Sequence, residues 1–153
     1  MGVTTRLERQ AFDPGHELAE LIAVADGDGA VVSFVGLARA RAKGGAKVEE
    51  LVLDHHPRLT EPSLRDIAGQ ALERFQVSHI HVVHRCGSVA PGDPIVFAAA
   101  ASPHRRAAFE AADYLMDRLK TDAVFWKREK GEAGSVWIEP TEEDVSARAR
   151  WDS

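Results

Sequence analysis

The chain has 153 residues, the length of one domain with a sizeable hydrophobic core. Hydrophobic residues make up 44%, charged residues 28%, and the net charge is -5, which excludes a general attraction for nucleic acid or acidic membranes. The single cysteine, Cys86, excludes an internal disulfide and is typical of a reducing compartment. No apolar run resembles a signal peptide or approaches the ~20 residues that span a bilayer. We therefore expect a cytoplasmic protein with neither a nucleic-acid nor a membrane partner.

Taken in chain order, the residue pattern predicts helices over 14–26, 59–75 and 102–120. It predicts strands over 29–39, 48–56, 79–87, 94–102 and 135–140, and a loop followed by a strand within 121–129. Neighbouring strands have short links, which favours antiparallel pairing and the α+β class. We expect one domain over 1–153 with a mostly antiparallel sheet. Its ends, 1–12 and 141–153, are expected to be loosely ordered, with a helix as the alternative for the polar tail.

The segment SPHRRAAFEAADYLMDRLK, residues 102–120, has an unusual distribution of charge. Ser102 is expected to cap the helix, with Pro103 in its first turn. One histidine and two arginines follow, His104, Arg105 and Arg106. Cations at this end oppose the helix dipole, which favours acidic groups there by roughly 0.3–1 kcal/mol each. The pattern is therefore unfavourable for the isolated helix, and a function is one explanation for it.

The two arginines have different expected surroundings. Arg106 falls on the polar face, where an ion pair with Glu110 would be sufficient. Arg105 falls on the apolar face, where a lone guanidinium is costly unless it is paired. A carboxylate from elsewhere in the fold could satisfy it. The alternative, which we favour, is an anion site made by His104, Arg105 and the free backbone N–H groups of the first turn.

Two lysines follow at the other end of this helix and in the next strand. Lys120 lies in the last helical turn, where a cation suits the dipole. In a strand, Phe125 and Lys127 share one face while Val124, Trp126 and Arg128 share the other. Lysines beside bulky apolar groups can have a lowered pKa and transfer protons. A surface strand with its lysine extended into solvent is an equal alternative.

The spacing along the helix limits which cations one small ligand can contact. Arg105 and Lys120 are fifteen residues apart, or about 22 Å in a straight helix. If both belong to one site, a second copy of the chain must supply one of them, as two-fold dimers readily do. The sequence therefore predicts a site shared across a homodimer interface.

Other candidate groups give weaker signals. Arg39 ends a predicted strand and precedes the basic, glycine-containing loop 40–47, which could close over an anion or simply be solvated. The strand histidines at 79, 81 and 84 do not share one face, and no cysteine or carboxylate completes a metal site with them. Cys86 is expected to be a small core residue.

Four segments together resemble the large, catalytic subunit of molybdopterin synthase. They are FVGLAR (34–39), HRCGSVAPGDPIVF (84–97), SPHRRAAFEAADYLMDRLK (102–120) and FWKRE (125–129). The resemblance covers residues 29–151, in order and with matching spacing. It implies an α/β hammerhead-type α+β domain.

The resemblance also implies an activity and partners. This family transfers two sulfurs to cyclic pyranopterin monophosphate (precursor Z), forming the dithiolene of molybdopterin. The sulfur arrives as a thiocarboxylate on the C-terminal Gly-Gly of a small ubiquitin-like subunit, whose tail enters a pocket of the large subunit. Two large subunits form the centre of a heterotetramer. No metal or other cofactor is expected, and Cys86 is not expected to carry sulfur.

Site residues carry over by position in the matching motifs. Lys120 and Lys127 match two essential lysines, for which we expect charge neutralisation at the thiocarboxylate and general acid/base catalysis respectively, although the roles could be exchanged. His104 and Arg105 match the anion-binding pair given across the dimer. The other implied substrate-binding or pocket-lining residues are Phe34, Leu37, Ala38, Arg39, Met116, Arg128 and Glu129. Leu37 and Ala38 could offer only backbone and apolar contacts.

Two other functions compete with the sulfurtransferase. The same cations would suit a non-catalytic module that binds a phosphorylated metabolite or an acidic peptide tail. A requirement for both lysines in turnover rather than in affinity separates these hypotheses. RNA binding is disfavoured by the acidic balance and by the lack of an aromatic and basic sheet motif.

Overall fold

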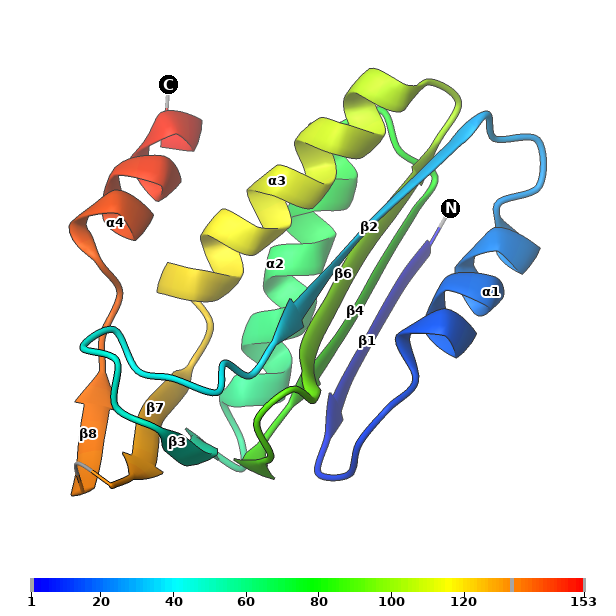
Figure 1. Ribbon diagram of the computed structural model, residues 1–153. Coiled ribbons are helices and arrows are strands. Elements are labelled where there is room, and N and C mark those ends of the chain that lie inside the picture. The colour runs from blue at the N-terminus through cyan, green and yellow to red at the C-terminus, as the bar shows by residue number, and fades with distance from the viewer. Residues whose placement is uncertain (1, 133, 153) are drawn as a thin grey trace.

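The computed structural model describes residues 2–132 and 134–152 and contains two sheets and four α-helices (Figure 1). The helices are α1 (Pro14–Val24), α2 (Thr60–Arg74), α3 (Arg105–Thr121) and α4 (Glu142–Ala149), followed by a 3-10 turn, Arg150–Asp152. The strands are β1 (Gly2–Glu8), β2 (Ala30–Leu37), β3 (Val48–His55), β4 (His79–Arg85), β5 (Gly87–Val89), β6 (Pro94–Ser102), β7 (Phe125–Gly131) and β8 (Gly134–Ile138). In the described residues, no helix is long and apolar enough to cross a membrane.

The main sheet has the strand order β1-β4-β6-β2, and the small sheet has the order β5-β3-β7-β8. Only β1 and β4 pair in parallel; every other described pair is antiparallel. The predicted α+β domain with mostly antiparallel sheets is therefore confirmed. The chain passes from the main sheet to the small one between β4 and β5, where Gly87 has a φ of 82° that favours glycine.

Helices cover both faces of the main sheet (Figure 1). On one face, α2 and α3 pack against β4 and β6 in the largest hydrophobic cluster, with Leu64 and Leu115 fully buried. On the other face, Leu21 of α1 packs against Phe97. A run of four alanines in β6, residues 98–101, lies in the middle of the sheet and is completely buried. Their small side chains let helices approach both faces closely.

The small sheet lies near the C-terminal end of α3 (Figure 1). Leu51, Leu53 and Val89 form its buried face together with Ala38, which follows β2. Phe125 packs against this cluster and against the main core, so it joins the two. The first residue of β7 is therefore anchored where the two sheets meet, which fixes the strand that carries Lys127.

The chain ends are more regular than the sequence indicates. Residues 1–12 were expected to be loosely ordered, but Gly2–Glu8 forms β1, paired with β4 over seven residues. In the tail, α4 and the 3-10 turn replace the loosely ordered alternative. Asp117 of α3 accepts hydrogen bonds from Arg150 Nη2 at 2.6 Å and Trp151 Nε1 at 2.7 Å. These contacts dock the tail on the domain.

The predicted helix starts also need correction. Ser102 is the last residue of β6 rather than a cap, and α3 has His104 at the N-cap with no side-chain cap. Ser102 Oγ instead accepts a hydrogen bond from the backbone N–H of His104 at 3.2 Å. Thr60 is the first residue of α2, and its hydroxyl donates to the Val124 carbonyl at 2.6 Å. The Thr60 hydroxyl thus joins α2 to the segment before β7, and the Ser102 hydroxyl joins the end of β6 to the start of α3.

Candidate functional site

A pocket of about 200 Å³ lies between the end of α3, strand β7 and the start of α4. It contains both lysines predicted from the sequence. Its lining residues are Leu119, Lys120, Thr121, Ala123, Phe125, Lys127, Ile138, Glu139, Pro140 and Asp144. Three separate segments therefore converge on two ammonium groups.

The two lysines reach the pocket from differently supported positions. Lys120 is exposed in the last turn of α3, next to the buried Leu119. Lys127 is partly buried in β7, paired with Leu53 on one side and Ile138 on the other. The ring of Phe125, on the same face of β7, stacks on His84 with centroids 4.2 Å apart. Lys127 therefore stands among apolar neighbours on a rigid strand, whereas Lys120 stands at a helix end.

Burial and charge both act on Lys127. Burial lowers the pKa of Lys127, the charge of Lys120 lowers it further, and Asp144 opposes both. His84 is fully enclosed, and burial lowers its pKa to about 3. Its Nδ1 lies 2.8 Å from the carbonyl of Arg85, so the neutral ring donates a hydrogen bond there. The site thus combines an ammonium group that loses its proton more easily than usual with a neutral imidazole.

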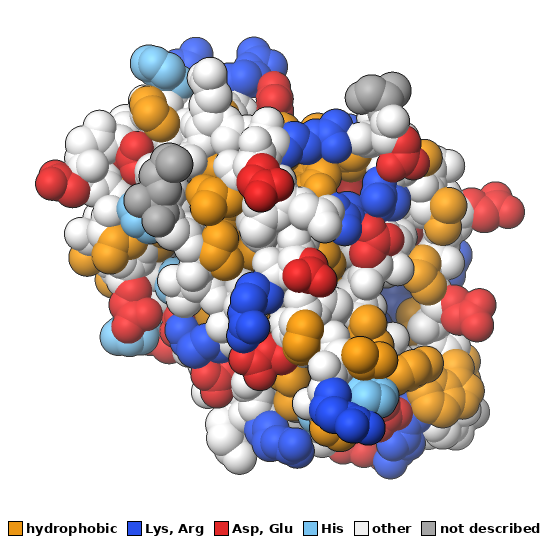
Figure 2. Space-filling view, turned by 180° about the vertical axis from the view of Figure 1, so that it is seen from behind, with side chains coloured by type: hydrophobic (Ala, Val, Ile, Leu, Met, Phe, Trp, Pro, Cys, Tyr) orange, Lys and Arg blue, Asp and Glu red, His pale blue; other side chains and the backbone are white. Residues whose placement is uncertain are grey.

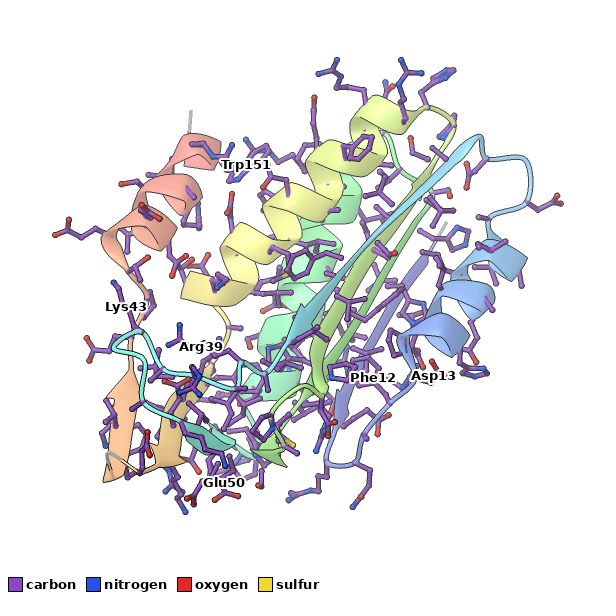
Figure 3. The ribbon with its side chains drawn as sticks, in the orientation of Figure 1. Phe12, Asp13, Arg39, Lys43, Glu50 and Trp151 are labelled. Carbon is purple, nitrogen blue, oxygen red and sulfur yellow. The ribbon has the colours of Figure 1, made fainter. Side chains whose placement is uncertain are left out.

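Arg39 is not among the residues that line this pocket. Figure 3 shows it on the segment after β2, close to the small sheet. Its Nε and Nη2 atoms donate to the two carboxylate oxygens of Glu129 at 3.0 and 3.3 Å. Glu129 is buried and occupies the same face of β7 as Lys127. The hydrogen bonds that Arg39 donates to Glu129 raise the pKa of Arg39 against the opposing effect of burial, and the charge of the carboxylate adds to the increase. This bidentate pair joins the end of β2 to the strand that carries Lys127.

Leu37 and Ala38, at the end of β2, have different surroundings. Ala38 is buried, and its backbone N–H already donates to the Asp93 carbonyl at 2.9 Å. Its carbonyl accepts from Gly92 at 2.7 Å. Leu37 is exposed. The backbone N–H of Ala38 is therefore already used by a hydrogen bond within the fold.

The apolar residues predicted to line the site lie elsewhere in the monomer. Phe34 is exposed on β2, the edge strand of the main sheet, and Met116 packs against the main core. Phe109 of α3 is also exposed. None of these three side chains lines the pocket of the two lysines.

Arg128 points away from the pocket, as strand alternation predicts. Its Nε donates to Asp54 Oδ2 at 3.1 Å, and its guanidinium carbon lies 5.8 Å from the ring centroid of Trp137. Trp126 is exposed on the same outer face. The resemblance places Arg128 in the wall of the site, but the structure separates it from Lys127 by the thickness of the strand.

The cations at the start of α3 lie at the opposite end of that helix from the pocket of the two lysines. His104 and Arg105 are exposed, and Arg105 lines a shallow hollow with Arg106, Phe109, Glu110 and Asp113. In the described part of the chain, Arg105 forms no ion pair, and neither does Arg106 with Glu110, contrary to our expectation. The monomer therefore presents these charges to solvent, about 22 Å along the helix from Lys120.

Both signs of charge are interspersed on the back of the molecule. Figure 2 shows Lys and Arg side chains alternating with Asp and Glu over this face, with apolar patches between them. No continuous basic surface appears on this face (Figure 2).

Potential metal ligands gather only at His16, Glu17 and Glu20 in the described ranges. Glu17 already accepts from Arg6 at 2.7 Å and lies 2.9 Å from Nε2 of His81. His16 lies 3.1 Å from Glu20 as an exposed pair on α1. These contacts account for the cluster as packing of α1 on the main sheet. Cys86 is buried, and burial raises the pKa of its thiol, which makes it a poor nucleophile.

With the exposed Glu139, Asp144 is one of two charged pocket residues that sequence reasoning missed. It belongs to TEED, residues 141–144, in the segment assigned to a polar tail. Thr141 and Asp144 form a reciprocal capping box at the start of α4. The threonine and the acid three residues later are a recognised helix-start pattern, and that signal could have located α4. Its place beside Lys127 could not be read from the chain.

Comparisons with known proteins assign the family. Residues 7–122 match the family model described as MoaE protein. A molybdopterin synthase catalytic subunit from Caulobacter vibrioides is 47% identical over 146 residues, covering 95% of each chain.

Solved structures agree with this assignment. A MoaE protein from Burkholderia ambifaria has a TM-score of 0.83 and 36% identity over 99% of both chains. Molybdopterin synthase from Staphylococcus aureus has a TM-score of 0.77 and 30% identity, over 86% of this chain and 94% of that one. A Helicobacter pylori complex of subunits 1 and 2 of molybdopterin-converting factor, 20% identical with a TM-score of 0.71, shares the fold over 88% of this chain and 89% of that one.

Matches of this extent and identity place the chain in a class of sulfur-transferring biosynthetic enzymes. The chain belongs to the MoaE family.

Proposed function

We propose that this chain is the catalytic subunit of a cytoplasmic molybdopterin synthase. It binds cyclic pyranopterin monophosphate and receives sulfur from the C-terminal thiocarboxylate of a small ubiquitin-like subunit. Two such transfers give the dithiolene of molybdopterin. The observation that carries the proposal is the convergence of Lys120 and Lys127 in one pocket of a chain that belongs to the MoaE family.

The surroundings of the lysines favour one assignment of their roles. Lys127 is partly buried with a lowered pKa, so it exchanges a proton near neutral pH more readily than an ordinary lysine. It serves as the general acid/base when the cyclic phosphate opens and the oxygen that sulfur replaces departs. Lys120 is more exposed and stabilises the negative charge that develops as the thiocarboxylate reacts.

The pocket suits the tail of a small partner subunit. It opens between α3, β7 and α4 and has apolar walls that include Leu119 and Ile138. An extended Gly-Gly tail has no side chains and fits a narrow opening of this kind. Its terminal anion would then lie beside two ammonium groups. The relatives' name, catalytic subunit, is consistent with such a partner.

The phosphate site is shared between two copies of the chain. In one monomer, Arg105 is too far along α3 from Lys120 to contact the same small ligand. Phe34 of edge strand β2 and Phe109 of α3 are exposed apolar side chains. An edge strand with exposed apolar side chains is a natural site for association. A second copy at this edge strand would bring His104 and Arg105 to the partner's pocket.

Reconstitution tests the enzyme assignment. The parent chain is combined with a thiocarboxylated small subunit and cyclic pyranopterin monophosphate, and dithiolene product is measured beside Lys127→Ala. We expect product from the parent and a loss of at least about 100-fold in the variant, the usual range for a general acid/base. Substrate binding without product from the parent would instead favour a non-catalytic binding module.

Mixing two inactive variants tests the shared site. Arg105→Ala and Lys127→Ala each damage a different half of it, so a mixed dimer retains one intact site. We expect activity to return on mixing, up to about a quarter of the parent level when exchange is random. Absence of recovery in a mixture shown to exchange subunits, or a monomer by light scattering at working concentration, would contradict the shared site.

A further inference from the structure

We propose that Asp144 is a positioning residue for Lys127: from the first turn of α4, its carboxylate holds the ammonium group in the pocket and offsets its repulsion from Lys120. The functional part of this inference rests on the proposed function, because it assumes that Lys127 takes part in sulfur transfer. The structural part does not, since it concerns only how the pocket is built.

The position of the Asp144 carboxylate is fixed by its own helix. Its Oδ2 accepts from the backbone N–H of Thr141 at 3.0 Å, while its backbone N–H donates to Thr141 Oγ1 at 3.1 Å. The side chain is partly buried and lines the pocket with both lysines. One carboxylate oxygen is therefore held by the cap, and the other takes no hydrogen bond from the rest of the described chain. This leaves it available to a cation.

The titratable groups around Lys127 come from its own strand and from four other segments. On β7, Glu129 lies on the same face and is paired with Arg39. Lys120 of α3 repels it, and His84 of β4 is neutral. Glu139, in the link before α4, lines the pocket but is exposed. Asp144 of α4 is the group that raises the pKa of Lys127 against burial and Lys120.

The adjoining strands supply no compensating charge. The residues that pair directly with Lys127 are Leu53 of β3 and Ile138 of β8, both apolar. The two ammonium groups at this pocket repel each other, and burial further disfavours the charged form of Lys127. An acidic group across the pocket lowers this cost without forming a close ion pair that would block the ammonium from substrate.

Docking of α4 holds the carboxylate in place. Arg148 Nε donates to Asp122 Oδ2 at 2.8 Å, directly after α3. Arg150 and Trp151 reach Asp117 one turn earlier, and Figure 3 shows Trp151 between α4 and α3. The tail thus brings an acid to the site because several contacts bind it to the helix that also carries Lys120.

The test compares Asp144→Asn with Glu143→Gln. Asparagine can still accept from Thr141, so the cap is kept and the charge is lost. Glu143 lies in the same helical turn, is exposed and does not line the pocket. The side-chain NMR signal of Lys127, identified by its absence in Lys127→Arg, is titrated in each protein. We expect the pKa of Lys127 to fall by about half a unit or more in Asp144→Asn and to stay unchanged in Glu143→Gln.

The pH profile of sulfur transfer gives a second readout. Whichever form of Lys127 the reaction needs, the limb of the profile that belongs to Lys127 should move to lower pH in Asp144→Asn by the same amount as the NMR titration. An unchanged Lys127 titration in Asp144→Asn, or an equal change in Glu143→Gln, would overturn the inference. A shifted Lys127 titration with an unshifted activity profile would uphold the electrostatic effect of Asp144 on Lys127 and reject the catalytic role of Lys127.

Discussion

The ion pair between Arg39 and Glu129 has unequal burial, and this predicts unequal effects of removing either partner. The Glu129 side chain is 9% exposed and the Arg39 side chain 52%. Arg39→Ala leaves a buried carboxylate without its two hydrogen bonds, whereas Glu129→Gln leaves an exposed guanidinium that water can solvate. Removing the partner of a buried charge costs 3–5 kcal/mol, and exposed pairs contribute about 0.2–1 kcal/mol.

This half-buried pair falls between those limits. We expect Arg39→Ala to lower the free energy of unfolding by about 2 kcal/mol and Glu129→Gln by about 1 kcal/mol. The double variant should reveal a coupling energy of about 1–2 kcal/mol. For a chain of this length, 2 kcal/mol corresponds to a decrease in Tm of roughly 4–8 °C.

Urea unfolding at fixed protein concentration measures these differences, since association also affects the midpoint. The matched control is Arg65 and Glu61, an exposed pair on α2 with 63% and 52% exposed side chains. Its double-mutant cycle should give about 0.5 kcal/mol or less. If Glu129→Gln proved more destabilising than Arg39→Ala, or if the two cycles gave equal coupling, the argument from burial would be refuted.

Three further predictions concern residues outside the pocket. Burial opposes ionisation of Glu17, yet hydrogen bonds from Arg6 and His81 lower its pKa below 4.5, so its charge stabilises the fold above that pH. Glu17→Gln should therefore lower the free energy of unfolding by about 2–3 kcal/mol at pH 7 and by much less near pH 3 in unfolding titrations. An equal cost at both pH values would argue against these contacts of Glu17. Cys86→Ser should keep sulfur transfer in the reconstituted assay while losing about 1–2 kcal/mol of stability, because a buried hydroxyl replaces a thiol; loss of transfer in a folded variant would give the thiol a chemical role. Trp151→Ala should lower stability by about 2 kcal/mol and increase hydrogen exchange in α4, and unchanged exchange there would show that other contacts dock the helix.

Strong local patterns gave reliable predictions of the fold. The strand 94–102 matches β6 residue for residue because its buried alanines and β-branched residues are bounded by a turn and a helix. Strand β1 was missed because its sequence, GVTTRLE, mixes polar and apolar residues without strict alternation. Its pairing with β4 depends on residues more than 70 positions away, which no local pattern contains.

The site was predictable in part. The resemblance identified Lys120 and Lys127, and strand alternation placed Arg128 opposite Lys127. The cap at Ser102 was wrong because that residue completes β6 before the helix begins. Asp144 was missed because its role depends on how α4 docks against α3, which is a property of the tertiary fold.

Single-turnover sulfur transfer is the measurement that tests the central claim most directly. Radiolabelled thiocarboxylate on the small subunit is followed into the pterin product, while binding of cyclic pyranopterin monophosphate is measured in the same samples. We expect rapid transfer with the parent chain, and binding without transfer with Lys120→Ala and with Lys127→Ala. Transfer at the parent rate in both folded variants would contradict a reaction centred on the pocket that these lysines share.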